Sequence, residues 1–199
     1  MSSDFSTIIL SSGLSERMGQ PKALLKWDKS TTFIEKIINE FVKAGSTKIV
    51  CMINEIIEPA CKKLSLPSNV ELVVNHHPDW GRFYSIRTGV NALNNSDYCF
   101  IHNVDNPFVS TKITDKLWAQ RKPGYWCSPN YKGKGGHPVL LSKEITDKIS
   151  TTSNLDFTLR DILQQFPKIP VSVTDNSILR NLNTPEEYNK RFNPNYSSE

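Results

Sequence analysis

Glycine and basic residues gather in a polar segment directly after a short apolar run near the N-terminus. Gly13 and Gly19 permit backbone angles that other residues avoid, so main-chain N–H groups there can approach anionic oxygens closely. Arg17 adds a forked donor, Lys22 a mobile positive charge, and Ser15 a hydroxyl and an N–H. These residue types suit a triphosphate. The alternative interpretation is a surface loop with turn glycines and solvated charges.

The spacing of this segment excludes two common phosphate loops. The Walker pattern needs a lysine directly after its second glycine, whereas Gln20 follows Gly19. The dinucleotide pattern G-x-G-x-x-G is absent, because Ser15 stands where its second glycine would be. The segment therefore indicates another kind of nucleotide loop.

Apolar runs and amphipathic stretches alternate through the first half of the chain. This alternation predicts a mostly parallel sheet with right-handed crossovers, in which ligands bind at the carboxyl ends of the strands. The polar segment follows the first of these strands, so it is well placed for a ligand. We expect strands at 6–10, 48–53, 70–74 and 98–104, and helices at 33–42, 57–64 and 85–93.

After residue 124 the pattern loosens. Shorter strands are expected at 138–141 and 171–174 and a helix at 156–166, and the polar stretch 192–199 is expected to fray. No repeat, linker or shift of composition marks a second domain. We expect one domain over 1–199, with an ordered core of about 6–192.

The composition is that of an ordinary globular protein. The 199 residues carry a net charge of +4, without a run of five like charges, so nucleic acid is not an expected partner. No apolar segment approaches the roughly 20 residues of a membrane helix, and no signal peptide is recognisable. We expect a cytoplasmic monomer or small homo-oligomer. Its scattered cysteines are interpreted as reduced packing residues: Cys51, Cys61, Cys99 and Cys127.

The N-terminal segment, "LSSGLSERMGQPKALL", resembles the signature L-A-A-G-x-S-x-R-M-G-x-P-K-x-L-L of the MobA-like nucleotidyltransferases. This family includes the molybdenum-cofactor cytidylyl- and guanylyltransferases. The resemblance implies a single-domain α/β fold, a Rossmann-like three-layer sandwich of the glycosyltransferase-A type. Ser11 and Ser12 replace the usual alanines, at positions that line the base pocket through their backbone. The residues implied to cradle the nucleotide, with Arg17 and Lys22 on its phosphates, are Gly13, Ser15, Arg17, Gly19 and Lys22.

Asp105 directly follows the predicted strand 98–104, within "HNVDNPFVS". Magnesium usually takes one or two protein carboxylates and completes its shell with phosphate oxygens and water. Asp-Asn-Pro is also ordinary turn chemistry, which is the alternative. The segment resembles the family's G-D-Q-P, with Val104 for Gly and Asn106 for Gln, which implies that Asp105 is a Mg²⁺ ligand and a catalytic residue.

A further match is "NHHPDWGRFYSIRTGV", which resembles the family's N-P-x-W-x-x-G-M-S-x-S-L-x-x-G. Gly81, Ser85 and Gly89 align, and Arg82 stands where methionine is common. The resemblance implies that Asn75, Gly81 and Ser85 border the nucleotide. The alternative is a helix start with an N-cap residue.

The remaining matches lie in the C-terminal half. "GKGGHPVLL" resembles the family's G-H-P, which places Gly136 and His137 near the acceptor. "NLNTPEEY" resembles D-I-D-T-P-E-D, whose second acidic residue is the other metal contact. Asn183 stands there, and its amide oxygen can still ligate magnesium with one negative charge fewer. The alternative for Asn183 is a helix N-cap.

The implied reaction is in-line attack by a small acceptor on the α-phosphorus of a nucleoside triphosphate, with pyrophosphate leaving. CTP is the favoured nucleotide and GTP the next. A phosphorylated acceptor, such as a molybdopterin-type cofactor, has a second pKa near 6 and needs no general base. A hydroxyl acceptor would need one, and His137 is the candidate.

Two functions of other classes remain open. A glycosyltransferase on this fold usually shows D-x-D, and Asp105-Asn106-Pro107 lacks the second aspartate. A non-catalytic nucleotide-binding or chaperone module would bind nucleotide and release no pyrophosphate. The sequence leaves undetermined the acceptor, the base preference, the oligomeric state and the effect of Val104 and Asn183 on activity.

Overall fold

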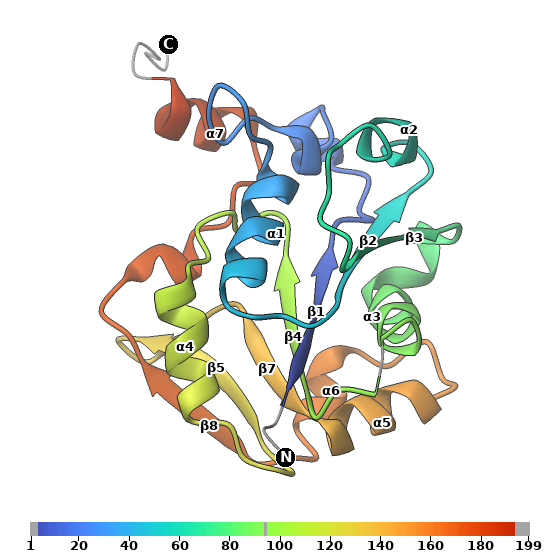
Figure 1. Cartoon of the computed structure of the whole chain (residues 1–199), viewed down its shortest axis with the longest axis vertical. Helices are drawn as coiled ribbons and strands as arrows, with labels where there is room; N and C mark the ends of the chain where they lie inside the picture. Colours follow the sequence, from blue (N-terminus) through green and yellow to red (C-terminus); the bar gives the residue numbers. More distant parts are fainter. Residues whose placement is uncertain (1–3, 94, 194–199) are drawn as a thin grey trace.

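The computed structural model describes residues 4–93 and 95–193, built around an eight-stranded sheet (Figure 1). The strand order is β3-β2-β1-β4-β7-β5-β6, and β8 pairs with β5. Because β7 is antiparallel to both β4 and β5, strands β5 and β8 run in the same direction as β1–β4. The strands are β1 Phe5–Leu10, β2 Ile49–Asn54, β3 Val70–Asn75, β4 Tyr98–Asn103, β5 Trp126–Tyr131, β6 Lys134–Gly135, β7 Val139–Ser142 and β8 Lys168–Ser172.

Helices cover both faces of the sheet, and each face has its own apolar core. Ile9 of β1 packs with α1 and α4, whereas Ile8 and Leu10 point the other way and pack with α3, α5 and α6. The predicted three-layer α/β sandwich with a mostly parallel sheet is therefore confirmed. The helices are α1 Phe33–Lys43, α2 Glu58–Cys61, α3 Gly81–Asn91, α4 Thr111–Ala119, α5 Lys143–Thr151, α6 Leu159–Leu163 and α7 Pro185–Phe192.

The first four strands and the first helix form where the apolar pattern predicts them. In α1, the residues Ile34, Ile37, Ile38 and Phe41 are fully buried at helical spacing, and each stabilises the fold by about 1.5–3 kcal/mol. The helix begins at a capping box, in which Thr32 accepts from the Glu35 N–H and Glu35 accepts from the Thr32 N–H.

Several elements differ from the expectation. The predicted helix 156–166 is confined to Leu159–Leu163, because Thr158 and Asp161 form a capping box that begins it there. The predicted helix 57–64 shortens to Glu58–Cys61, and the helix expected from residue 85 already begins at Gly81. The last expected strand lies at Lys168–Ser172 instead of 171–174. Helices α4, α5 and α7 and strands β5 and β6 were not predicted.

The structure also bears on the expectations for the C-terminal stretch and the cysteines. The stretch 192–199, expected to fray, lies outside the described residues beyond Asn193. All four cysteines are buried and free, as predicted. No helix in the described ranges is long and apolar enough to cross a membrane.

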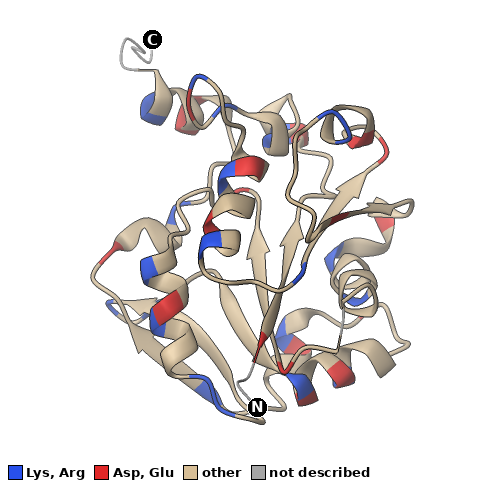
Figure 2. Cartoon of the chain, viewed as in Figure 1, with Lys and Arg blue, Asp and Glu red and all other residues tan. Residues whose placement is uncertain are grey.

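The central pairing brings two loops to the same edge of the sheet. Strands β1 and β4 are parallel neighbours, with Leu10 opposite Asn103. Strands β1, β2 and β4 carry no charged side chain and are drawn uncharged in Figure 2. Charges at this edge must therefore come from the loops and helices that surround these strands.

Strand β4 also contains a buried histidine. His102 is fully buried, and its Nε2 donates to the carbonyl oxygen of Asn106 at 2.7 Å. Its Nδ1 has no hydrogen-bond partner among the described residues. Burial lowers the pKa of His102 to about 3, so the imidazole is neutral at pH 7.

This pKa predicts a loss of stability in acid. Below the ordinary pKa of 6.5 the unfolded chain binds a proton at His102, whereas the folded chain binds one only near pH 3, so stability falls as pH falls between these values. Replacing His102→Gln should reduce the change in unfolding free energy between pH 7 and pH 5 by on the order of 1–2 kcal/mol. Urea titrations at both pH values measure it. The exposed His76→Gln is the control, and an equal change in wild type and His102→Gln would contradict the assignment.

Candidate active site

The loop after β1 is held against the sheet by its backbone and by one apolar side chain. The N–H of Ser11 donates to the carbonyl of Met52 at 2.9 Å, and Met18 is almost fully buried. Ser15 and Gly19 have positive φ angles of 57° and 69°, flanking a 3₁₀ turn over Glu16–Met18. The loop thus folds back toward the sheet, and a second 3₁₀ turn at Lys22–Leu24 leads on to α1.

A cavity of about 270 Å³ opens beside this loop at the carboxyl ends of β1 and β4. Such an edge is where parallel α/β sheets bind ligands. Eight of the residues predicted from the sequence line it: Ser11, Ser12, Gly13, Ser15, Lys22, Gly81, Ser85 and Asp105. The residues that line it without having been assigned a role are Leu10, Pro78, Arg82, Asn103 and Val104.

Hydroxyl and amide groups fix the floor of this cavity, which we call the small cavity. The Ser12 and Ser85 hydroxyls are 2.9 Å apart, and Asn75 Nδ2 donates to Ser85 Oγ at 2.9 Å. Asn54 Nδ2 donates to the Ser12 carbonyl at 3.2 Å. Asn75 is buried and does not line the cavity, so it supports Ser85. The segment does contain a helix start, as the alternative expected, but α3 begins at Gly81, so Ser85 lies inside the helix and is not its N-cap.

Two predicted phosphate-loop residues lie outside the small cavity. Arg17 is exposed and is not among the lining residues, although its charge contributes to lowering the pKa of Lys22. Gly19 closes the 3₁₀ turn, where its N–H donates to the Glu16 carbonyl at 3.1 Å. The geometry therefore gives Gly19 a turn position, and a contact of Arg17 with phosphate stays a prediction.

Asp105 and Lys22 line the small cavity, and Asn183 lies beside Lys22. The Leu182 N–H donates to the Asp105 carbonyl at 2.8 Å, which brings the next residue, Asn183, beside the β4 loop. Lys22 Nζ donates to Asn183 Oδ1 at 2.7 Å. Thr184 is the N-cap of α7, so the capping alternative for Asn183 is excluded.

Burial disfavours the ionised forms of Asp105 and Lys22. Burial raises the pKa of Asp105, and the charges of Lys22 and Arg82 act against that rise. Burial also lowers the pKa of Lys22, which Asp105 opposes. One carboxylate oxygen of Asp105, Oδ1, is buried without a hydrogen-bond partner in the described part of the chain.

This donor set fits a hard divalent cation that also binds the ligand. An unpartnered carboxylate oxygen on Asp105 and an amide oxygen on Asn183 are the oxygen ligands that such cations prefer. Within residues 4–93 and 95–193, no cluster of three or more His, Cys, Asp or Glu could hold a metal alone. A cation here needs phosphate oxygens or water to complete its shell.

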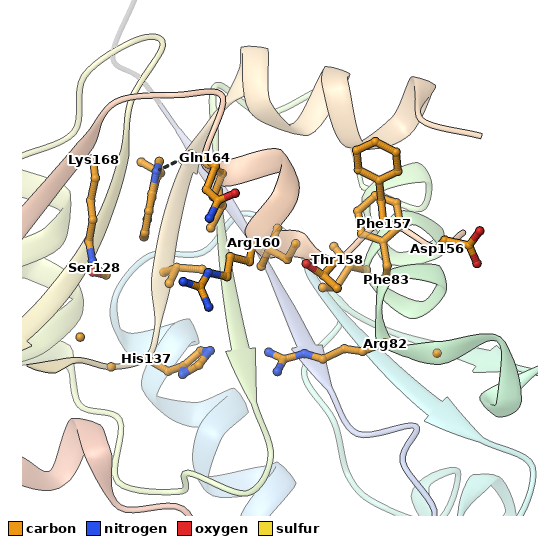
Figure 3. Close-up of a pocket in the computed structure, with 18 of the residues that line it drawn as sticks. Arg82, Phe83, Ser128, His137, Asp156, Phe157, Thr158, Arg160, Gln164 and Lys168 are labelled. Atoms are coloured by element: carbon orange, nitrogen blue, oxygen red, sulfur yellow. Dashed lines mark hydrogen bonds between the residues drawn. The ribbon is translucent and has the colours of Figure 1, made fainter. Parts of the chain in front are cut away.

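A second, larger cavity of about 850 Å³ adjoins the small one (Figure 3). Gly81 and Arg82 line both. Aromatic walls are formed by Phe83, Trp126 and Phe157, while Arg82, Arg160 and Lys168 supply positive charge. Gly136 and His137, predicted near the acceptor, line this large cavity and not the small one.

Backbone packing fixes the position of His137. A Cβ at Gly136 would collide with the carbonyl oxygen of Ile178, so only glycine fits. The Gly136 N–H donates to the Pro129 carbonyl at 3.0 Å, and the His137 N–H to the Ile178 carbonyl at 3.4 Å. Burial and the neighbouring charge of Arg82 lower the pKa of His137 to about 4.

Arg82 and Asn103 are the polar residues of the small cavity to which the sequence assigned no role. Arg82 Nη2 donates to Asn103 Oδ1 at 2.7 Å, and Asn103 Nδ2 lies 3.3 Å from His137 Nε2. An arginine in a methionine position was the only signal for Arg82. Asn103 ends an apolar strand and gave no signal, because its importance arises from contacts with distant segments.

The chain is similar to known proteins over most of its length. The family model of the MobA-like NTP transferase domain matches residues 7–169, well over half of the chain. The chain is 28% identical over 185 residues to the molybdenum cofactor cytidylyltransferase of Escherichia coli (strain K12), a match that covers 91% of this chain and 92% of that protein. It is 24% identical over 190 residues to the nicotine blue oxidoreductase of Paenarthrobacter nicotinovorans, covering 90% and 92%.

The fold also matches solved structures. The crystal structure of Rv0371c from Mycobacterium tuberculosis H37Rv has a TM-score of 0.79 at 18% identity, and the match covers 96% of this chain and 97% of that one. The same protein has been crystallised in complex with manganese, with a TM-score of 0.73 at 17% identity. With the loop after β1 and the strand order described above, the match to the family model shows that the chain belongs to the family of MobA-like NTP transferase domains.

Proposed function

We propose that this protein transfers a nucleoside monophosphate from a nucleoside triphosphate to a small acceptor and releases pyrophosphate. The observation that carries the proposal is the meeting of two cavities at Gly81 and Arg82, with Lys22 and Asp105 in the wall of the smaller one. The small cavity takes the nucleotide and the large one the acceptor. The α-phosphorus then lies where the two molecules meet.

The small cavity suits the nucleotide because it combines open backbone, hydroxyls and one mobile cation. Gly13 carries no side chain, and nothing lies within 4 Å of where its Cβ would be, so a phosphate or ribose can approach the main chain. Lys22 Nζ lies on the amide of Asn183 and can turn toward a phosphate oxygen. We favour CTP, with GTP next, because the Escherichia coli relative is a cytidylyltransferase.

Asp105 and Asn183 would hold the cation, for which we propose Mg²⁺. A bound divalent cation neutralises part of the charge on the triphosphate oxygens. The backbone of Asp105 is fixed by the hydrogen bond that its carbonyl accepts from the Leu182 N–H, so the residue is already positioned at this edge of the sheet before a cation arrives. The manganese complex of Rv0371c supports a divalent cation on this fold.

The reaction requires little covalent chemistry from the protein. An acceptor oxygen forms a bond to the α-phosphorus while the bond to the pyrophosphate oxygen breaks, and pyrophosphate leaves with the electron pair. Lys22, and Arg17 if the loop brings it inward, offset the negative charge of the triphosphate. A phosphate monoester acceptor arrives ionised at neutral pH. We therefore propose a phosphorylated acceptor of the molybdopterin type, as the name of the Escherichia coli relative suggests.

Nucleotide binding is tested first by thermal unfolding with Mg²⁺ and CTP, GTP, ATP or UTP. At a hundred times its dissociation constant, one triphosphate should stabilise the wild type by about 2.7 kcal/mol, or roughly 5–10 °C. Lys22→Ala should lose most of this shift, because it removes the only lysine of the small cavity among the described residues. The exposed neighbour Lys26→Ala is the matched control. If no triphosphate shifts the transition, the proposal is wrong, and nucleotide-sugars should be screened.

Catalysis is then tested with the bound nucleotide by pyrophosphate release in the presence of phosphorylated acceptors. A nucleotide that binds without pyrophosphate release from any acceptor would identify a non-catalytic binding module. Transfer of a sugar from a nucleotide-sugar would identify a glycosyltransferase.

Asp105→Asn separates the role of this carboxylate in stability from its role in binding. Burial raises the pKa of Asp105, which means that the ionised carboxylate is less favourable in the folded protein than in the unfolded chain at pH 7. The neutral amide should therefore raise the melting temperature of the protein without ligand. It should also remove the dependence of nucleotide binding on Mg²⁺, measured by titrating the nucleotide with and without the cation. An unchanged dependence on Mg²⁺ would show that Asp105 is not a ligand.

A further inference from the structure

Arg82 stands at the junction of the two cavities without a carboxylate partner. It is the second residue of α3, and it lines both cavities. None of the described acidic residues forms an ion pair with it within 4.0 Å, and its guanidinium donates a hydrogen bond to the neutral amide of Asn103. Asp105 acts on it only through the longer-range field. An arginine guanidinium that faces a cavity without a carboxylate partner is suited to bind an anionic group of a ligand.

Hydrogen bonds fix the direction in which this guanidinium points. Arginine only donates, so Asn103 must turn its Oδ1 toward Arg82 and its Nδ2 toward His137. Nε2 of His137 then accepts, and the neutral ring carries its proton on Nδ1. Figure 3 shows the Arg82 head directed toward His137 across the large cavity. Asn103, whose amide is oriented by His137, thus holds Nη2 of Arg82, and the guanidinium faces the large cavity (Figure 3).

The residues around Arg82 indicate that its guanidinium binds the acceptor. His137 lines only the large cavity, and the guanidinium of Arg160 also points into the space in front of it (Figure 3). The small cavity has its own cation in Lys22. The aromatic rings of Phe83 and Phe157 form an apolar wall on the same side, which suits a flat organic group attached to the anion.

We propose that Arg82 is a specificity-determining residue that binds the attacking anionic group of the acceptor at the junction of the cavities, with Asn103 and His137 as positioning residues. This inference rests on the proposed function. It adds that recognition of the acceptor's charge depends on one arginine of α3, which the nucleotide does not require. An acceptor without a negative charge leaves the Arg82 guanidinium without an anionic partner, so the site rejects it.

The test uses phenyl phosphate as a probe that combines a ring and an anionic group. It is titrated calorimetrically into full-length protein saturated with Mg²⁺ and α,β-methylene-CTP, which occupies the nucleotide site without reacting. Arg82→Met should weaken phenyl phosphate binding about tenfold or more, the usual effect of losing a charge-assisted hydrogen bond. Arg82→Lys should recover part of it. The affinity for α,β-methylene-CTP should stay within about twofold of wild type in every variant.

Arg87→Met is the matched control, since Arg87 lies on the same helix, lines neither cavity and binds the carbonyls of Thr152 and Ser153. It should leave phenyl phosphate binding unchanged. If Arg82→Met is unstable, Arg82→Gln gives the same test, because it loses the charge and keeps a donor toward Asn103.

The outcomes separate this inference from the proposed function. Failure of the wild type to bind α,β-methylene-CTP would contradict the proposed function itself. Normal binding of that nucleotide, with phenyl phosphate bound equally by wild type and Arg82→Met or by neither, would overturn only the role of Arg82. A parallel loss of nucleotide affinity in Arg82→Met would assign the arginine to the nucleotide and would also overturn the inference.

Discussion

The parallel pairing of β1 with β4 is the constraint on which the rest of the site depends. Leu10 lies opposite Asn103, and the N–H of Val104 donates to the Leu10 carbonyl at 3.1 Å, so both strands end at the same level. The glycine loop and the Asp105 turn therefore leave the sheet side by side. A shift of one residue in this register would turn Asn103 to the opposite face and separate it from Arg82.

Basic side chains outnumber acidic ones in the lining of the small cavity. Lys22 and Arg82 line it together with a single acidic residue, Asp105. Asn183 accepts from Lys22 where a second carboxylate would form an ion pair. The amide therefore places no second negative charge beside Lys22, which leaves that ammonium group available to a polyanion such as a triphosphate. Asp105 Oδ1 has no hydrogen-bond partner among the described residues and is available to a cation.

Much of the first half of the fold could be predicted from the sequence, because β1, β2 and β4 are continuous buried runs and α1 has four apolar residues at helical spacing. Much of the second half could not, although the strand expected at 138–141 is found at Val139–Ser142. Strand β5 contains Ser128, Pro129 and Asn130, residues that are depleted in strands, and it is stabilised by pairing with β7 and β8. Helix α4 buries only Ile113, Thr114 and Leu117, too few for a clear periodicity.

The candidate site, too, could be predicted only in part from the sequence. The loop motif predicted five residues that line the small cavity, since chain neighbours in a turn stay neighbours in space, but Arg17 and Gly19 of the same motif lie outside it. Arg82, Asn103 and His137 come from α3, β4 and the segment before β7, and their contact depends on strand register and helix position. No spacing along the chain encodes that contact. The position of His137 was predictable, but its protonation state was not.

That protonation state bears on which acceptors the site can use. To act as a general base toward a hydroxyl, His137 Nε2 would have to give up the hydrogen bond from Asn103, and a pKa of about 4 makes it a weak base at neutral pH. Releasing Asn103 would also free the oxygen that orients Arg82. An acceptor that arrives as an anion avoids both costs, because it needs no base and it occupies the arginine. The hydrogen bonds that neutralise His137 as a base are therefore the same ones that present Arg82 to a charged nucleophile.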